Sequence, residues 1–192
     1  MRISWALISG VNSLTRFDPD KHHRRSIRLK KYDYSGNGAY FVTLCTYDRG
    51  CYFDEFPLLR EIVETRWLEI PTRYDHISLD DYVIMPNHFH GIIVFDNSQT
   101  EMACTKKPDL GSVIGSFKSL AVNDWLKAIS SQKINARGKF WQDNYYEHVV
   151  RNEAEHDRIR EYIRNNPAQW ELDRENSSNF RNTGVMPEKW MV

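Results

Sequence analysis

Two histidines separated by one residue, His88 and His90, are the pair in this sequence whose spacing most directly suggests chemistry. They open an apolar stretch that ends at Phe95 and is typical of a β-strand. On a strand, residues i and i+2 point to the same face, so the two imidazoles would lie side by side. In that arrangement they can share one divalent metal ion, which would satisfy ring nitrogens that cost about 1–3 kcal/mol each when buried without a partner. Two core histidines satisfied by ordinary hydrogen bonds are the alternative, and the pair alone leaves it open.

A tyrosine and an asparagine near the C-terminal end form a second candidate group. Tyr162 and Asn166 are four residues apart in a helical pattern, which places them on one helix face, next to the apolar Ile159 and Ile163. If this helix lies across the sheet near the histidines, Asn166 is a candidate third ligand and Tyr162 sits one turn from it. The alternatives are a tyrosine that only packs and an asparagine that only caps the helix end. The tyrosines that spacing alone ranks equally with Tyr162 are Tyr145 and Tyr146.

The elements that must position these residues follow from hydrophobic periodicity. The predicted strands cover residues 39–46, 77–85, 88–95 and part of 140–151, and the predicted helices cover residues 57–73, 110–129 and 153–166. The order β-α-β-β-α-β-α predicts an α+β fold: a ferredoxin-like (split βαβ) antiparallel sheet with helices on one face, plus a C-terminal helix that carries the tyrosine. The third strand is apolar on both faces, so we expect it in the middle of the sheet. A fold of this kind does not by itself determine function.

Local signals predict where two of the helices begin and end. Pro71 is expected to bend or end the first long helix. Asn152 is expected to cap the last helix, with Glu155 three residues later in a capping-box pattern. Pro167 is expected to stop that helix and to push Asn166 toward non-helical angles, leaving the chain beyond it irregular.

The length and composition suit one globular domain with tails. The chain has 192 residues, of which 41% are hydrophobic and 13% aromatic, enough for a substantial core. The mean hydropathy of −0.64 excludes a membrane protein, and no apolar run approaches the roughly 20 residues that cross a bilayer. We expect a basic N-terminal arm over residues 1–35, a catalytic domain over 36–170 and a tail over 171–192.

The cysteines point to a reducing compartment. Cys45, Cys51 and Cys104 form no paired motif and no zinc-binding spacing. Free thiols are typical of proteins in a reducing environment, so we expect the protein to be cytoplasmic.

The formal net charge is zero, which taken alone argues against a nucleic-acid-binding protein. The distribution of charge favours one, because basic residues gather near the N-terminus without acids among them and again in the second half of the chain. A solvated tail is the alternative for the first group. The residues expected to contact DNA are Arg24, Arg25, Arg28, Lys30 and Lys31, at phosphates, and Lys118 on the second long helix, at the strand to be cut. For Lys118 the alternative is a side chain that only faces water.

Several segments together resemble one enzyme family. The sequence Met85–Ile92 is similar to the His-hydrophobe-His (HUH) motif of single-tyrosine HUH transposases, and Glu161–Pro167 resembles their tyrosine helix. Further segments of this chain resemble one branch of that family, the REP-associated tyrosine transposases. The segments similar to that branch are Arg24–Leu29, Gly38–Thr43, Ile114–Ser119 and Trp141–Asn152, and the resemblance spans residues 20 to 170.

The resemblance implies a specific chemistry. Tyr162 would attack a DNA phosphodiester and become joined to the 5′ phosphate, freeing a 3′ hydroxyl. His88 and His90 would bind a divalent metal, Mg²⁺ or Mn²⁺, with Asn166 as the third ligand. Asn166 departs from the glutamine of the insertion-sequence branch but is expected in the REP-associated branch. The partner would be single-stranded or hairpin DNA from palindromic repeats, handled by a monomer or a homodimer, with the protein nucleoid-associated when bound.

Two other functions compete with this interpretation. One is a non-catalytic protein that binds DNA hairpins, and the other is a metal-dependent nuclease in which water attacks. A covalent protein–DNA product separates both from the tyrosine mechanism. Trp141 and Tyr145 are further candidates, as aromatic platforms for unpaired bases, although core packing is the favoured role of Trp141.

Overall fold

The computed structural model describes residues 32–98, 108–172 and 176. The chain divides into two compact units, residues 1–30 and 31–192, and all the described residues belong to the second. None of its described helices is long and apolar enough to cross a membrane. The elements are β1 (Gly38–Cys45), η2 (Tyr47–Arg49), α1 (Tyr52–Glu55), α2 (Pro57–Leu68), α3 (Ile70–Arg73), β2 (Ile77–Ile84), β3 (His88–Phe95), α4 (Leu110–Gln132), β4 (Tyr146–Val150), α5 (Glu153–Asn165) and η3 (Asn166–Leu172).

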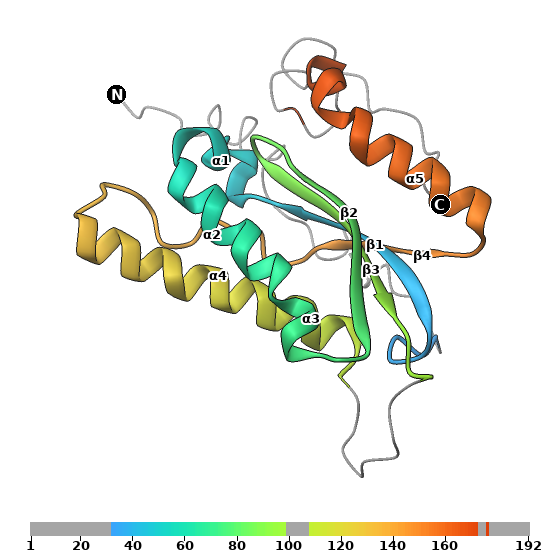
Figure 1. Ribbon diagram of the computed structural model, residues 1–192. Helices are drawn as coiled ribbons and strands as arrows, with labels where there is room; N and C mark the ends of the chain where they lie inside the picture. Colours follow the sequence, from blue (N-terminus) through green and yellow to red (C-terminus); the bar gives the residue numbers. More distant parts are fainter. Residues whose placement is uncertain (1–31, 99–107, 173–175, 177–192) are drawn as a thin grey trace, which may run out of the picture. The chain divides into compact units, whose positions relative to one another are not determined.

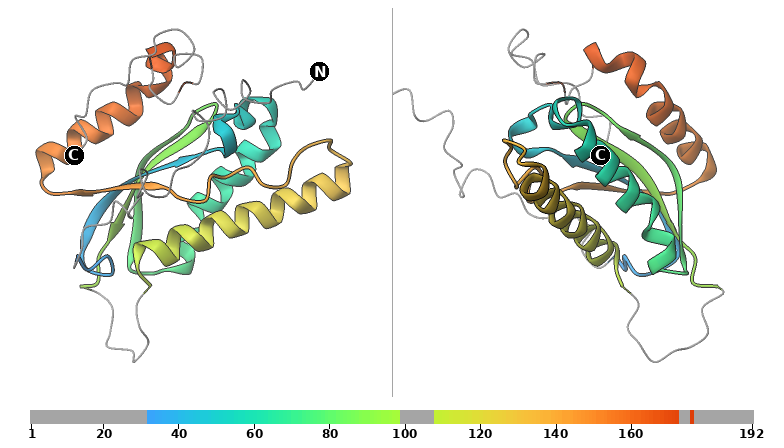
Figure 2. Two further views of the ribbon diagram at one scale, coloured as in Figure 1. Left: turned by 180° about the vertical axis from the view of Figure 1, so that it is seen from behind. Right: turned by 60° about the vertical axis from the view of Figure 1, so that its left-hand side comes forward.

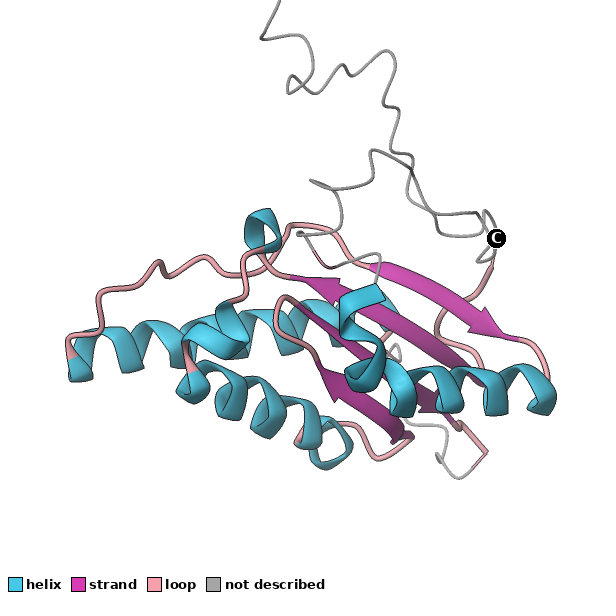
Figure 3. Cartoon of the chain, turned by 90° about the horizontal axis from the view of Figure 1, so that it is seen from above, coloured by secondary structure: helices cyan, strands magenta, loops and turns pink. Residues whose placement is uncertain are grey.

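The four strands form one antiparallel sheet, as the sequence predicts. Their order is β2-β3-β1-β4, the strand order of a ferredoxin-like fold, and each neighbouring pair is antiparallel (Figure 1). The strands lie side by side in the view from above (Figure 3). The expected central position of β3 is confirmed, since β3 pairs with β1 on one side and β2 on the other.

The two faces of the sheet are covered differently. Helices α2 and α4 cover one face, and α5 lies on the opposite side (Figures 1 and 2). The first face carries the main core, in which Trp67 of α2, Phe89 of β3 and Phe117 of α4 pack together. The second face carries a small cluster of four buried residues: Phe41, Ile92, Ile159 and Ile163. The helix that bears Tyr162 therefore rests on a much smaller apolar contact than the rest of the fold.

The first long helix is interrupted at Glu69, two residues before Pro71. Helix α2 ends at Leu68, and a separate turn, α3, starts at Ile70 after Glu69. Pro71 lies in the first turn of α3, where its missing N–H leaves no hydrogen bond unmade. The proline thus helps to start the new turn, and the expectation that it bends or ends the first long helix is confirmed to within two residues.

The predicted start of α5 is confirmed, and the α-helix ends at Asn165, within one residue of the predicted end. The expected non-helical angles at Asn166 and the irregular chain beyond it are wrong. Asn152 Oδ1 accepts the Glu155 N–H at 2.9 Å, while the Glu155 carboxylate accepts the Arg151 N–H at 2.7 Å. Asn166, however, is helical, with φ −55° and ψ −44°, and the chain continues through η3 to Leu172. A residue before proline is disfavoured in the α region without being barred from it. Here Asn166 is 2% exposed, so its packing outweighs that local preference.

The packing around Gly91 on β3 leaves no room for a side chain. A Cβ there would lie 2.6 Å from the Trp67 ring and 2.8 Å from the Phe89 ring. We expect Gly91→Ala to lower the free energy of unfolding by about 1–3 kcal/mol, because those buried rings must shift. The control is Gly115→Ala on α4, where a Cβ meets nothing within 4 Å and should be neutral or stabilising. Urea denaturation of both variants measures the difference, and equal midpoints would contradict the expectation.

Candidate active site

Both candidate histidines lie on the face of β3 that α5 covers. His88 is fully buried and His90 is 3% exposed, and their ring centroids are 4.5 Å apart. They share this face with Ile92, which contributes to the small cluster under α5. The alternation of β3 therefore brings the two rings together, as the His-x-His spacing predicts.

Hydrogen bonds fix the orientation of the His88 ring. The amide of Asn87 donates from Nδ2 to the Arg49 carbonyl at 3.2 Å, so its Oδ1 is the atom that faces His88. That oxygen lies 2.9 Å from His88 Nδ1 and can only accept. His88 Nδ1 must therefore carry the proton, and the lone pair of the neutral ring resides on Nε2. A lone pair on one nitrogen and a donated proton on the other is how histidines ligate metals in proteins.

His90 lies between two hydroxyl groups. Its Nδ1 is 2.8 Å from Oγ1 of Thr43, its register partner on β1, and its Nε2 is 3.2 Å from the hydroxyl oxygen of Tyr162. If Nδ1–H donates to Thr43, Nε2 accepts the Tyr162 O–H, and His90 takes the same tautomer as His88. The tyrosine hydroxyl is thus placed against the nitrogen that would bind a metal.

Tyr162 reaches the histidines from α5. Its ring contacts His90 and Phe41, with centroids 5.3 and 6.2 Å apart. Of the two other tyrosines that spacing ranked equally, Tyr146 is on the same sheet face but on β4, opposite Thr43 of β1. Two strand spacings, about 10 Å, thus separate its Cα from that of His90. Tyr145 packs against the core on the other face.

Asn166 is the third of the predicted metal ligands. It is one helical turn beyond Tyr162, and its Oδ1 is buried without a hydrogen-bond partner among the described residues. Such an orphaned acceptor is costly unless something occupies its position. Two imidazole nitrogens and an amide oxygen suit a divalent cation that keeps further positions for water or phosphate. No group of three or more His, Cys, Asp and Glu residues suited to a metal occurs within the described segments. A metal site formed by His88, His90 and Asn166 stays a prediction.

The residues expected to contact DNA are only in part within the structure. Arg24, Arg25, Arg28, Lys30 and Lys31 lie outside the described residues. Lys118 is on α4 and donates from Nζ to the backbone carbonyls of Gln142 and Asp143, at 2.6 and 3.0 Å. Burial lowers the pKa of its ammonium group. In this arrangement Lys118 ties α4 to the segment before β4, and a role in DNA contact stays a prediction.

Another basic group lies near the His88 end of the sheet. Arg137 and Lys139 stand over the ring of Tyr47, at 4.8 and 5.3 Å from its centroid. The neighbouring Thr46 donates through its hydroxyl to the carbonyl of Asn87, at 2.8 Å. Cations and an aromatic ring are the groups that bind phosphates and stack bases of single strands.

Of the two tryptophans near the site, Trp141 is buried in the core and Trp170 is half-buried. Trp141 is 3% exposed and packs against Phe53, Phe117 and Phe140, so its favoured core role is confirmed. Trp170 of η3 was not expected at the site, yet its ring centroid is 6.0 Å from that of His88. The sequence analysis missed it because the chain beyond Pro167 was expected to be irregular.

Thr43 and Asn87 were also missed, for different reasons. Asn87 directly precedes His88, so the polar residue flanking the motif was a usable signal. Thr43 is 47 residues from His90, and only the register between β1 and β3 brings the two together.

Comparison with known proteins gives one relative of clear sequence similarity. No family model matches the sequence. An uncharacterized protein from Haemophilus influenzae is 36% identical over 179 residues, covering 83% of this chain and 96% of the relative. A solved structure of a REP-associated tyrosine transposase bound to a REP hairpin aligns with 83% of this chain and 88% of that chain, at 16% identity and a TM-score of 0.48.

Proposed function

We propose that this chain, which belongs to the same protein family as the uncharacterized Haemophilus influenzae protein, cuts and rejoins single-stranded or hairpin DNA through a covalent tyrosine intermediate. The observation that carries the proposal is the 3.2 Å contact between the Tyr162 hydroxyl and His90 Nε2. A tyrosine placed in this way on a separate helix, against two buried histidines, has the arrangement of a nucleophile beside a metal site. The sequence resemblance to single-tyrosine HUH transposases agrees with it.

The reaction would exchange one phosphoester bond for another. The Tyr162 hydroxyl oxygen forms a bond to the DNA phosphorus as the bond from phosphorus to the 3′ oxygen breaks. The products are a 5′ phosphate joined to the tyrosine and a free 3′ hydroxyl. The phenol gives up its proton to solvent, and the departing 3′ oxygen takes one proton up from solvent, so the protons balance. Rejoining is the reverse, with a DNA 3′ hydroxyl attacking the phosphotyrosine. Because each step conserves one phosphoester bond, no nucleotide cofactor is required.

His88, His90 and Asn166 would hold a divalent ion, Mg²⁺ or Mn²⁺. A bound ion supplies stabilisation of the charge that develops on the phosphate oxygens during attack. Mn²⁺ tolerates imidazole ligands better than Mg²⁺, which prefers oxygen, so Mn²⁺ is the first ion to test. The hydrogen bonds that the two rings make to Asn87 Oδ1 and Thr43 Oγ1 would orient them toward it.

The DNA substrate would meet basic and aromatic residues around this site. Tyr47, Arg137 and Lys139 lie at the strand end that carries His88, and the basic N-terminal residues would add phosphate contacts. Each phosphate contact that is removed should lower the salt slope of DNA binding by about 0.7–0.9. The nature of the partner is thus proposed from charge and from the sequence resemblance.

The test is a denaturing gel of the full chain with labelled hairpin oligonucleotides that carry single-stranded flanks, with and without Mn²⁺. A metal-dependent band of protein joined to DNA supports the proposal. Nicked DNA without that band would replace it with a nuclease in which water attacks. Binding without cleavage across a panel of genomic palindromes would replace it with a non-catalytic hairpin-binding protein.

Thr43 gives a prediction about the metal that does not depend on activity. Thr43→Val removes the hydroxyl that faces His90 Nδ1 while keeping the branched shape suited to β1. We expect Mn²⁺ affinity to fall by about 10–100-fold, as for other residues that orient a metal-binding histidine. Titration of Mn²⁺ by electron paramagnetic resonance measures the loss. Unchanged affinity in a folded variant would mean that Thr43 does not orient the ligand.

A further inference from the structure

Helix α5 has little apolar surface to hold it in place. Of its 13 residues only Ile159 and Ile163 are buried, and they pack on Phe41 and Ile92 of the sheet. Two apolar side chains on a flat sheet restrain a helix weakly against rolling about its own axis. Other contacts must fix the rotation of α5 about its own axis if the Tyr162 hydroxyl is to stay beside His90.

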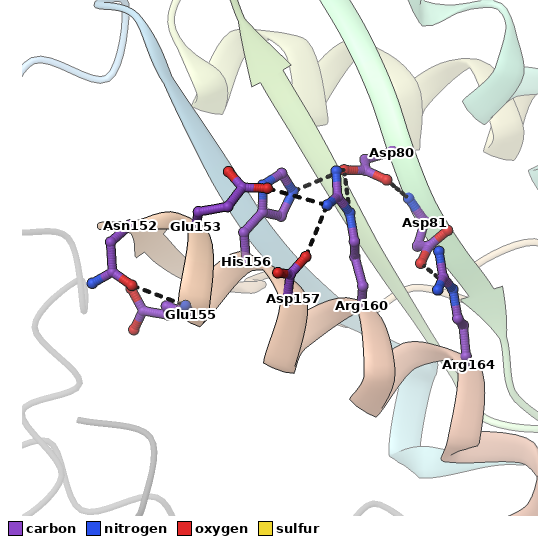
Figure 4. Close-up of polar contacts among 9 residues, drawn as sticks. All are labelled: Asp80, Asp81, Asn152, Glu153, Glu155, His156, Asp157, Arg160 and Arg164. Atoms are coloured by element: carbon purple, nitrogen blue, oxygen red, sulfur yellow. Dashed lines mark hydrogen bonds and ion pairs between the residues drawn. The ribbon is translucent and has the colours of Figure 1, made fainter.

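Strand β2 carries an irregularity that faces this helix. Leu79 pairs with Ile93 and Tyr82 pairs with Gly91, so β2 uses one residue more than β3 over this stretch. The extra residue is a β-bulge, which redirects side chains that would otherwise alternate between the two faces. Asp80 and Asp81, consecutive in sequence, both contact α5 as a result (Figure 4).

Three cationic or polar side chains of α5 meet these two carboxylates. Asp80 Oδ2 accepts from Arg160 Nε at 2.9 Å and Nη2 at 2.6 Å, and lies 2.8 Å from His156 Nε2. Arg164 Nε is 2.7 Å from Asp81 Oδ2. These three α5 residues are spaced by four, so they form one stripe along the helix. We call the five residues the α5 clamp.

The clamp is partly shielded from water. The side chains of Asp80 and Arg160 are 20% and 28% exposed. Burial alone would raise the pKa of Asp80, but hydrogen bonds from Arg160 and from the Asp81 N–H hold it below its ordinary value. The carboxylate therefore stays charged at neutral pH, and its contact with Arg160 is a charge-assisted hydrogen bond.

The clamp and the tyrosine lie on opposite flanks of the buried face. At about 100° per residue, Tyr162 lies roughly 160° around the helix from Arg160, with Ile163 and Ile159 between them. The clamp faces β2, while the Tyr162 ring contacts Phe41 of β1 and His90 of β3. Rolling α5 away from β2 by about 20° would move the phenol oxygen by roughly 3 Å, given a helix radius near 2.3 Å plus the side-chain length.

We propose that Arg160, held by Asp80, is a positioning residue that sets the roll of α5 and thereby the place of the Tyr162 hydroxyl. This inference rests on the proposed function, since it assigns a task to the helix that carries the nucleophile. Displacing a reacting atom by about 1 Å can cost about 100-fold in rate. The clamp would therefore act on the rate of attack and leave DNA binding alone.

The test compares Arg160→Met, which keeps the aliphatic stem, with Arg160→Lys, Asp80→Asn and the double variant. The matched control is Arg158→Met, an exposed arginine of the same helix. At saturating oligonucleotide and Mn²⁺, we expect Arg160→Met to form the covalent adduct about 10–100-fold more slowly, with oligonucleotide affinity unchanged. Arg160→Lys should be intermediate, Arg158→Met should match wild type, and the double variant should be no slower than either single one.

A spectroscopic readout separates this inference from the proposed function. With 3-fluorotyrosine at position 162, the ¹⁹F resonance should shift in Arg160→Met and Asp80→Asn and stay in place in Arg158→Met, whether or not the protein cleaves DNA. An unmoved resonance and a wild-type adduct rate in folded Arg160→Met would overturn the positioning role. A shifted resonance in a protein whose wild type forms no adduct would keep the clamp and remove the proposed function.

Discussion

Replacing Tyr162 by phenylalanine is expected to abolish the covalent protein–DNA adduct while leaving DNA binding intact. The substitution removes only the oxygen that lies 3.2 Å from His90 Nε2, and the ring can keep its contacts with Phe41 and His90. The substitution therefore removes the proposed nucleophile with little loss of shape. The cost to the free energy of unfolding should be about 0.5–1.5 kcal/mol, the contribution of one hydrogen bond. Denaturing gels for the adduct and fluorescence anisotropy for binding measure the two effects.

The matched control is Tyr146→Phe. Tyr146 lies on the same face of the sheet, in the cluster under α5, but its Cα is two strands from that of His90. The Tyr146→Phe variant should form the adduct at the wild-type rate. An adduct that survives Tyr162→Phe and disappears in Tyr146→Phe would reassign the nucleophile.

The second large effect is expected at the histidines. His90→Ala and His88→Ala should each slow adduct formation by at least about 100-fold, because loss of a ligand removes several kcal/mol of charge stabilisation in the transition state. Removing the metal with a chelator should slow the wild-type protein similarly and add little to the effect of either variant. The rate of adduct formation over a range of Mn²⁺ concentrations measures the effects of His90→Ala, His88→Ala and the chelator.

The control for burial is His76→Ala. His76 is 9% exposed and lies just before β2, with its ring against Tyr74 and Phe95. Its loss should lower stability without changing the Mn²⁺ dependence. If His76→Ala slowed the reaction as much as His90→Ala, the effect of the latter would be one of folding, and the metal role would fail.

The fold was accessible from sequence because its signals are local. Runs of apolar, β-branched and aromatic residues along β1 and β3, and helical periodicity along α2, α4 and α5, predicted the α+β order, and the ferredoxin-like strand order followed from it. The cap at Asn152 was read from two residues three apart. The errors arose where packing overrides local preference, as at Asn166, which stays helical before Pro167 because it is buried.

The individual residues of the candidate site could be predicted from the sequence, but the way in which the fold brings them together could not. Spacing indicated the pair of His88 and His90 and the pair of Tyr162 and Asn166, but it ranked Tyr145 and Tyr146 equally with Tyr162, and the family resemblance selected Tyr162. Their approach depends on α5 crossing the sheet, which no local pattern specifies. The bulge at Asp80 and Asp81 is the clearest example, since two consecutive acids in a strand signal an irregularity only once their partners on α5 are known.

The central claim, that Tyr162 is the group that attacks DNA, is tested most directly by mass spectrometry of the trapped adduct. The wild-type protein is incubated with a hairpin oligonucleotide and Mn²⁺ and then digested with protease and nuclease. The digest is searched for peptides that carry a nucleotide. We predict a 5′-phosphate-linked nucleotide on the peptide containing Tyr162, with fragment ions that place the added mass on that residue. The same mass on Tyr145, Tyr146 or any other residue would contradict the account.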